Sequence, residues 1–115
     1  MIYSGSCHCG KTAYTVEGEL QEVTECNCSI CQRRGYLLWF LPREKLTLKS
    51  PETAMKFYTF NKHRIRHYFC PDCGSAPFGL GADGKGREMV AVNIRCLEGV
   101  DVAGVKRKLF DGRSL

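Results

Sequence analysis

The chain has 115 residues, 43% of them hydrophobic and 25% charged, which is the composition of one ordinary globular domain over residues 1–115 and excludes global disorder. No apolar run approaches the roughly 20 residues that a membrane-spanning helix needs, so we expect no membrane as a partner. The net charge of +5 by itself leaves nucleic-acid binding open.

Alternating apolar residues between turn-forming residues predict a series of short strands. Residues 61–63 separate two of these strands and are typical of a tight connection within an adjacent pair. The glycine-rich stretch 79–86 lacks the Lys-Ser/Thr and the helix of a phosphate-binding loop, so we expect a hairpin loop there. The expected strands are residues 11–17, 21–25, 36–41, 46–49, 55–60, 64–69, 76–80, 89–94 and 105–110.

Little helix is expected. Residues 28–34 are expected to form a knuckle running into one helical turn that Gly35 stops. The apolar run 36–41, bounded by Gly35 and Pro42, predicts a buried central strand. No segment keeps a 3.6-residue period, so the predicted fold class is mainly β, with folded-over sheets of short strands. Aromatic residues inside the strands are expected in the core and not on a nucleic-acid surface: Tyr36, Trp39, Phe40, Tyr58, Phe60, Tyr68 and Phe69.

Four of the eight cysteines form two pairs with the same local chemistry. Closely spaced cysteines on a tight turn place two sulfur atoms about one ion, and glycine after the pair supplies the positive φ that such a turn often needs. Each pair has that glycine, so we expect the four thiolates to bind one structural zinc that fixes the amino end of the chain to its middle. The cysteines are Cys7, Cys9, Cys70 and Cys73, and the glycines are Gly10 and Gly74.

Cys26, Cys28 and Cys31 form a different kind of cluster. Three cysteines within six residues can bind one metal ion from one side, and no fourth cysteine lies nearby in the sequence. An open position of this kind is typical of a zinc that takes part in chemistry. The alternative is a closed structural site, and the two interpretations stay open from the residues alone. The candidate fourth ligands are Cys96, His8, His63 and His67.

Cysteine thiols avoid forming disulfides when the protein is in a reducing compartment or when they bind a metal ion. The first six residues reach a cysteine with no room for a secretion signal, so we expect a cytoplasmic protein whose cysteines bind metal instead of forming disulfides. If seven cysteines bind two Zn²⁺ ions as thiolates, the net charge falls from +5 to roughly +2. This argues against nucleic acid as a partner.

The spacing of seven cysteines resembles that of the glutathione-dependent formaldehyde-activating enzymes, a family that includes the centromere protein V-like proteins and has the Mss4-like fold. The segments 92–99 and 110–113 fit the same pattern. The resemblance covers nearly the whole chain. It is carried by three motifs, which are Ser6-Cys7-His8-Cys9-Gly10, Cys26-x-Cys28-x-x-Cys31 and Phe69-Cys70-x-x-Cys73-Gly74-Ser75.

The resemblance implies folded-over antiparallel sheets with a structural zinc on the two cysteine pairs. It also implies a second zinc, the more readily lost of the two, on Cys26, Cys28 and Cys31, where the activity would reside. The implied reaction condenses glutathione, or a similar small thiol, with formaldehyde or a related aldehyde. The product is an S-hydroxymethyl adduct, so the enzyme is formally a carbon–sulfur lyase run in reverse. Cys96 lies outside the implied ligands.

Three thiolates on one Zn²⁺ limit the chemistry that the second site could perform. Such a centre is net negative and therefore a weak Lewis acid toward an aldehyde oxygen. It is better suited to accepting a substrate thiol and holding it as a thiolate. The competing hypothesis is a non-catalytic module on the same fold, which binds zinc, a thiol or another protein without accelerating a reaction.

Overall fold

The structure, a computed structural model, describes residues 1–114. The strands in this part of the chain are β1 (Ile2–Ser6), β2 (Ala13–Glu17), β3 (Glu22–Cys26), β4 (Leu38–Pro42), β5 (Leu46–Leu48), β6 (Lys56–Tyr58), β7 (Arg66–Phe69), β8 (Phe78–Ala82), β9 (Glu88–Asn93) and β10 (Lys106–Phe110). The α-helix is α1 (Ser29–Arg34), and the short 3-10 turns are η1 (Arg43–Lys45), η2 (Glu52–Ala54), η3 (Ile94–Cys96) and η4 (Gly112–Ser114). None of these helices has the length and apolar character to span a bilayer.

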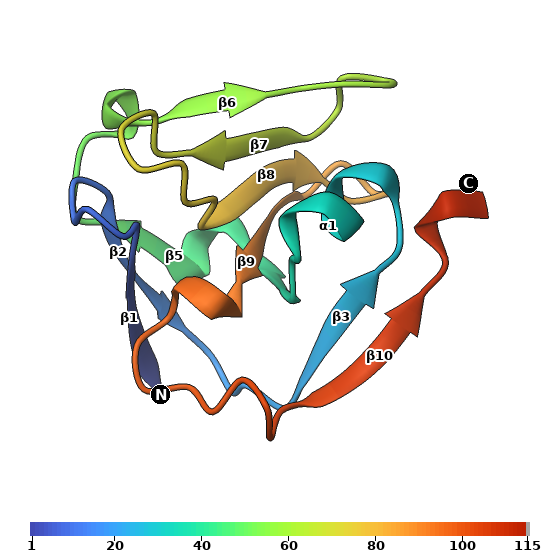
Figure 1. Cartoon of the computed structure of the whole chain (residues 1–115), viewed down its shortest axis with the longest axis horizontal. Coiled ribbons are helices and arrows are strands. Elements are labelled where there is room, and N and C mark those ends of the chain that lie inside the picture. The colour runs from blue at the N-terminus through green and yellow to red at the C-terminus, as the bar shows by residue number, and fades with distance from the viewer. Residues whose placement is uncertain (115) are drawn as a thin grey trace.

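The strands form two sheets, one of three strands in the order β1-β2-β5 and one of seven in the order β10-β3-β4-β9-β8-β7-β6. In Figure 1 the larger sheet curves from β6 at the top to β10 at the lower right, around α1. The mainly β class with folded-over sheets and little helix is therefore confirmed. Strand pairs are antiparallel as expected, except that β10 runs parallel to β3.

Strand β1 is the element that the sequence-based prediction lacks. Its Ser4-Gly5-Ser6 run has no apolar alternation, and it forms because it pairs with β2 from Ile2↔Glu17 to Ser6↔Ala13. Gly5 is required in this pairing, since a Cβ there would collide with the ring of Tyr14. The other nine strands lie within two residues of their predicted bounds.

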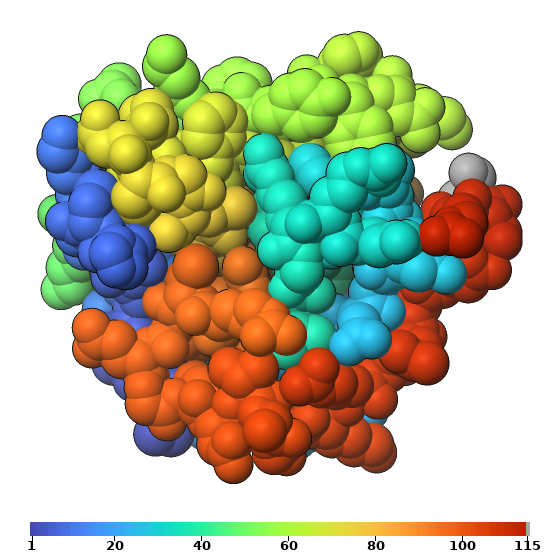
Figure 2. All heavy atoms as spheres, in the orientation of Figure 1, coloured from blue at the N-terminus to red at the C-terminus, as the bar shows by residue number. Residues whose placement is uncertain are grey.

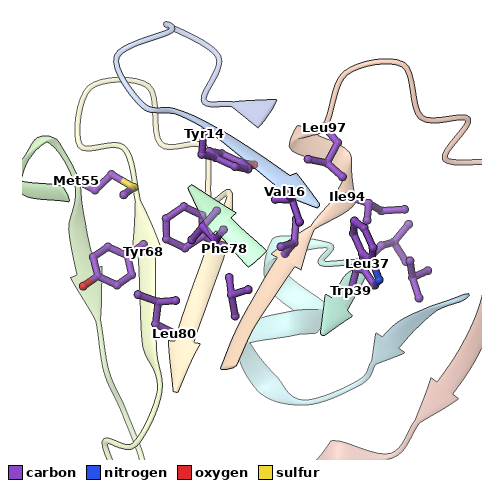
Figure 3. Packing of buried hydrophobic residues seen from close by; sticks show 14 residues of the cluster. Tyr14, Val16, Leu37, Trp39, Met55, Tyr68, Phe78, Leu80, Ile94 and Leu97 are labelled. Carbon is purple, nitrogen blue, oxygen red and sulfur yellow. The ribbon is translucent and has the colours of Figure 1, made fainter. Parts of the chain in front are cut away.

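The hydrophobic core lies between the smaller sheet and one face of the larger sheet (Figure 3). Tyr14 of β2 meets Phe78 of β8 edge to face, with ring centroids 5.4 Å apart, and Val16 faces the same layer. Both Tyr14 and Phe78 are almost fully buried. The core therefore uses one face of the larger sheet, and a separate apolar cluster on α1 packs with Cys26, Cys28 and Cys31.

The prediction that residues 36–41 form a buried central strand is confirmed in its central position and wrong in the burial of Phe40. The strand β4 begins at Leu38 and is central, between β3 and β9. Its side chains alternate between faces, so Trp39 enters the core with 5% exposure whereas Phe40 points to the other face with 51% exposure. Tyr58, also expected in the core, is half exposed. The reason is that, within residues 1–114, no second sheet covers this face.

Candidate metal centres

The first group of cysteines sits on two turns of the same construction. Cys7 directly follows β1, and the amide of Gly10 donates to the Cys7 carbonyl at 3.2 Å with φ +84° at Gly10. Cys70 directly follows β7, and the amide of Gly74 donates to the Cys70 carbonyl at 2.8 Å with φ +81° at Gly74. Glycine is suited to both positions because other residues are strained at these angles.

The two turns face each other and bring their four sulfur atoms together, all within 4.8 Å of one another. The Sγ atom of Cys9 lies 3.6 Å from that of Cys7 and 3.6 Å from that of Cys70. Tetrahedral zinc with Zn–S bonds of about 2.3 Å places neighbouring sulfurs about 3.8 Å apart. The spacing of Cys7, Cys9, Cys70 and Cys73 therefore fits a four-thiolate metal site.

Hydrogen bonds around this group favour thiolates, the form that metals bind. The hydroxyl of Ser75 lies 3.5 Å from the Sγ atom of Cys73, and together with the Ser75 amide it lowers the pKa of Cys73 to about 5. The amide of Thr12 donates to the Sγ atom of Cys7 at 3.3 Å. Ser75 also accepts a hydrogen bond from the His8 amide at 3.2 Å, which links the two turns.

The second group is built around the start of α1. Cys26 ends β3, Cys28 is the N-cap of α1, and Cys31 lies buried one turn into the helix. Their sulfur atoms also lie within 4.8 Å of one another. The predicted helical turn is confirmed, and Gly35 ends it in the left-handed conformation with φ +68°.

The electrostatics of the second group differ from one cysteine to the next. Burial raises the pKa of Cys31, and the neighbouring thiolates add to this effect. Burial opposes ionisation of Cys28 too, but the nearby backbone amide of Cys31 and the side chains of Cys31 and Cys26 hold its pKa below the usual value. The amide of Cys28 donates to the Sγ atom of Cys26 at 3.4 Å. Burial nevertheless raises the pKa of Cys26, so Cys28 is the cysteine of this group whose pKa is lowered.

None of the candidate fourth ligands joins the second group. Within residues 1–114, no further Cys, His, Asp or Glu places a ligand atom within 4.8 Å of all three sulfurs. Burial, together with the charges of Cys7 and Cys73, raises the pKa of Cys96 to about 11, which places Cys96 on the side of the first group. His63 is exposed and its Nδ1 atom lies 2.7 Å from the hydroxyl of Thr59. The arrangement of the described residues therefore favours the open-site interpretation.

The carboxyl-terminal segment 110–114 is hydrogen-bonded to the loop that carries the second group. The sequence analysis did not predict this contact. The side chain of Asn27, which lies between two of the cysteines, donates to Asp111 at 3.0 Å and accepts from the amide of Arg113 at 2.9 Å. The amide of Asn27 donates to the carbonyl of Phe110 at 3.2 Å. In the sequence, residues 110–113 were noted as fitting the family pattern, but that fit did not predict which residues they contact.

Gly112 lets this segment approach the sulfur atoms, which gives a testable prediction. A Cβ on Gly112 would lie 2.6 Å from the Sγ atom of Cys26, closer than real atoms pack, and 3.1 Å from the Cβ of Cys28, which is tighter than most real contacts. We expect Gly112→Ala to weaken metal binding by the second group at least tenfold, measured by competition with a chromophoric chelator. Gly84→Ala is the control, because a Cβ there meets nothing within 4 Å. Equal metal affinity of the two variants would contradict the close approach.

Two hollows border the second group. The larger has a volume of about 690 Å³ and is lined by all three cysteines, whereas the smaller, of about 440 Å³, reaches only Cys26 and Cys31. Figure 2 shows α1, the end of β3 and the carboxyl-terminal segment gathered on one face of the molecule. The larger hollow is thus the one that all three cysteines line together, and its size suits a small ligand.

Comparison with known proteins agrees with this arrangement. A model of the family "glutathione-dependent formaldehyde-activating enzyme" matches residues 2–110, which include both cysteine groups. The crystal structure of a Rhodobacter sphaeroides protein is similar, with a TM-score of 0.78 and 27% identity over 91% of this chain and 99% of that chain. The chain therefore belongs to the glutathione-dependent formaldehyde-activating enzyme family.

Proposed function

We propose that the protein adds glutathione, or a similar small thiol, to formaldehyde or a related aldehyde, and that both cysteine groups hold zinc. The observation that carries this proposal is a group of three sulfur atoms, with no fourth protein ligand among the described residues, at the wall of a cavity. Four-sulfur sites are closed and structural, whereas sites with an open position are typical of catalysis. Membership of the family supports the choice of thiol and aldehyde.

The second group, Cys26, Cys28 and Cys31, would hold the zinc at which the thiol reacts. Zinc bound there supplies a position that takes a thiol and keeps it deprotonated. The protein contributes the arrangement of the three sulfurs, supported by backbone amides. A free thiol with a pKa near 8.5 is only a few per cent ionised at neutral pH, so holding the thiolate raises its reactive fraction by roughly tenfold.

Two cations at the cavity suit a thiol that carries carboxylates, as glutathione does. Lys62 and Arg113 both line the larger hollow, and within residues 1–114 neither forms an ion pair. Arg113 donates to the side-chain oxygen of Gln32 at 2.6 Å, which orients the guanidinium group. An arginine held in this way can bind a carboxylate with two hydrogen bonds.

The reaction is an addition without oxidation or reduction. A bond forms between the thiolate sulfur and the carbonyl carbon, the electron pair of the C=O π bond moves to the oxygen, and that oxygen takes a proton from water. The proton of the thiol leaves to solvent when the thiolate forms. Positioning of the two reactants next to each other provides the remaining acceleration.

The test combines metal analysis with kinetics. We expect two zinc ions per chain, and exchange NMR with ¹³C-formaldehyde and glutathione should show adduct formation that rises linearly with enzyme concentration above the uncatalysed rate. The uncatalysed rate must be subtracted because formaldehyde reacts with free thiols unaided. Saturable glutathione binding with no rate increase at any enzyme concentration would favour the non-catalytic module instead.

A further inference from the structure

The larger hollow has its floor on one face of the seven-stranded sheet. The register places Phe40 of β4 opposite Ala91, Ala91 opposite Gly79, Gly79 opposite His67, and His67 opposite Tyr58. These five residues therefore form one row across five strands. The small residues Ala91 and Gly79 stand in the middle of the row with larger ones at its ends, and this order of sizes hollows the sheet surface beside the cysteines.

Apolar side chains surround this row. Phe40, Ile65 and Phe110 are 51%, 48% and 47% exposed, although all three line the hollow. Ile65 lies directly over Gly79, with its Cγ2 atom 3.5 Å from where a Cβ would stand. Among the described residues that line the hollow, none is acidic. Burial, helped by the charge of Arg34, lowers the pKa of His67, which favours the uncharged form of this side chain in the wall.

This apolar surface matches neither formaldehyde nor glutathione. Formaldehyde has no substituent to cover it, and glutathione carries two carboxylates and an ammonium group that are drawn to water and to the cations Lys62 and Arg113. Apolar area removed from water contributes about 25 cal/mol per Å². A ligand that places an apolar group against this wall would gain the free energy of removing the wall from water. Formaldehyde and glutathione would leave the wall exposed to water.

We propose that the site selects aldehydes that carry an aromatic or branched alkyl group, which lies on the row from Phe40 to Gly79 while the thiol sulfur is held at the three cysteines. This inference rests on the proposed function and specifies its carbonyl substrate. The bond changes are those of the addition described above. The sulfur bonds to the aldehyde carbon, the oxygen takes a proton from water, and the apolar group is carried unchanged into the product.

Binding of unreactive analogues tests the site independently of catalysis. Calorimetry of the zinc-loaded protein should show that S-benzylglutathione binds about tenfold more tightly than S-methylglutathione, because only the benzyl group covers the apolar wall. Ala91→Leu fills the hollow and Phe40→Ala removes part of its wall. In each variant, S-benzylglutathione should bind less than threefold more tightly than S-methylglutathione. Phe40 is half exposed and outside the core, so its variant remains informative if Ala91→Leu does not fold.

Ala103→Leu is the matched control, since it makes the same change on an exposed turn outside the hollow, and it should keep the tenfold preference. In kinetics, the kcat/KM ratio for benzaldehyde over formaldehyde should fall about tenfold in Ala91→Leu and stay unchanged in Ala103→Leu. Equal binding of the two analogues by the unmodified protein, or a preference that survives both substitutions, would overturn the inference. A benzyl preference without acceleration of any aldehyde would overturn the proposed function and still assign the apolar ligand class.

Discussion

A protein carrying Cys70→Ser is expected to lose the metal of the first cysteine group and its cooperative thermal unfolding. Cys70 is fully buried and Cys7 is 2% exposed, and their turns join the end of β1 to the end of β7. Structural zinc in small domains contributes apparent free energies of about 10–16 kcal/mol, which is comparable to the whole free energy of unfolding of a domain. A serine oxygen is a poor substitute for a thiolate toward zinc.

Circular dichroism and metal analysis would measure this effect. We expect one zinc ion fewer per chain, and either no cooperative transition or a Tm lowered by more than about 15 °C. Cys96→Ser is the control, because it makes the same replacement at a half-buried cysteine outside both groups, and it should shift the Tm by a few degrees at most. If Cys70→Ser kept its zinc content and its Tm, the first group would not be a structural metal site.

The features that the sequence predicts well are those determined by neighbouring residues. The two cysteine turns were predicted from the glycines that follow them, and both Gly10 and Gly74 adopt the positive φ that the prediction needs. The helical turn after the middle cysteines was also predicted, and Gly35 was expected to end it. A glycine in the left-handed conformation is a local signal for the end of a helix, and Gly35 adopts that conformation. The local pattern of apolar residues, alternating in most segments and continuous in residues 36–41, sufficed to predict nine strands.

The features that the sequence did not predict depend on which distant segments meet. Strand β1 forms through its pairing with β2, and Gly5 is explained only by the ring of Tyr14 beside it. The contact of Asn27 with the carboxyl-terminal segment joins residues 84 positions apart. Phe40 is exposed because, in the part of the chain that the structure describes, no second sheet covers that face, and an apolar run in the sequence cannot reveal this.

A protein carrying Cys28→Ser is expected to lose thiol addition and to keep its fold. Cys28 occupies the N-cap of α1 without making a side-chain cap hydrogen bond, and serine is among the preferred residues at an N-cap. The helix is therefore retained while the second group keeps only two sulfurs. Loss of the third thiolate weakens the metal site and removes the arrangement in which the substrate thiol is held.

Adduct formation in Cys28→Ser should fall to the uncatalysed rate, a loss of at least about a hundredfold in the enzymatic contribution if this site is the catalytic one. The Tm should stay within a few degrees of the unmodified protein, which separates this variant from Cys70→Ser. Cys96→Ser again serves as the control and should keep full activity, since Cys96 contributes no sulfur to the second group. A Cys28→Ser protein that retains its rate above background would show that the three-cysteine group is not where the thiol reacts, because no other described cluster leaves its sulfur atoms without a fourth ligand beside the cavity.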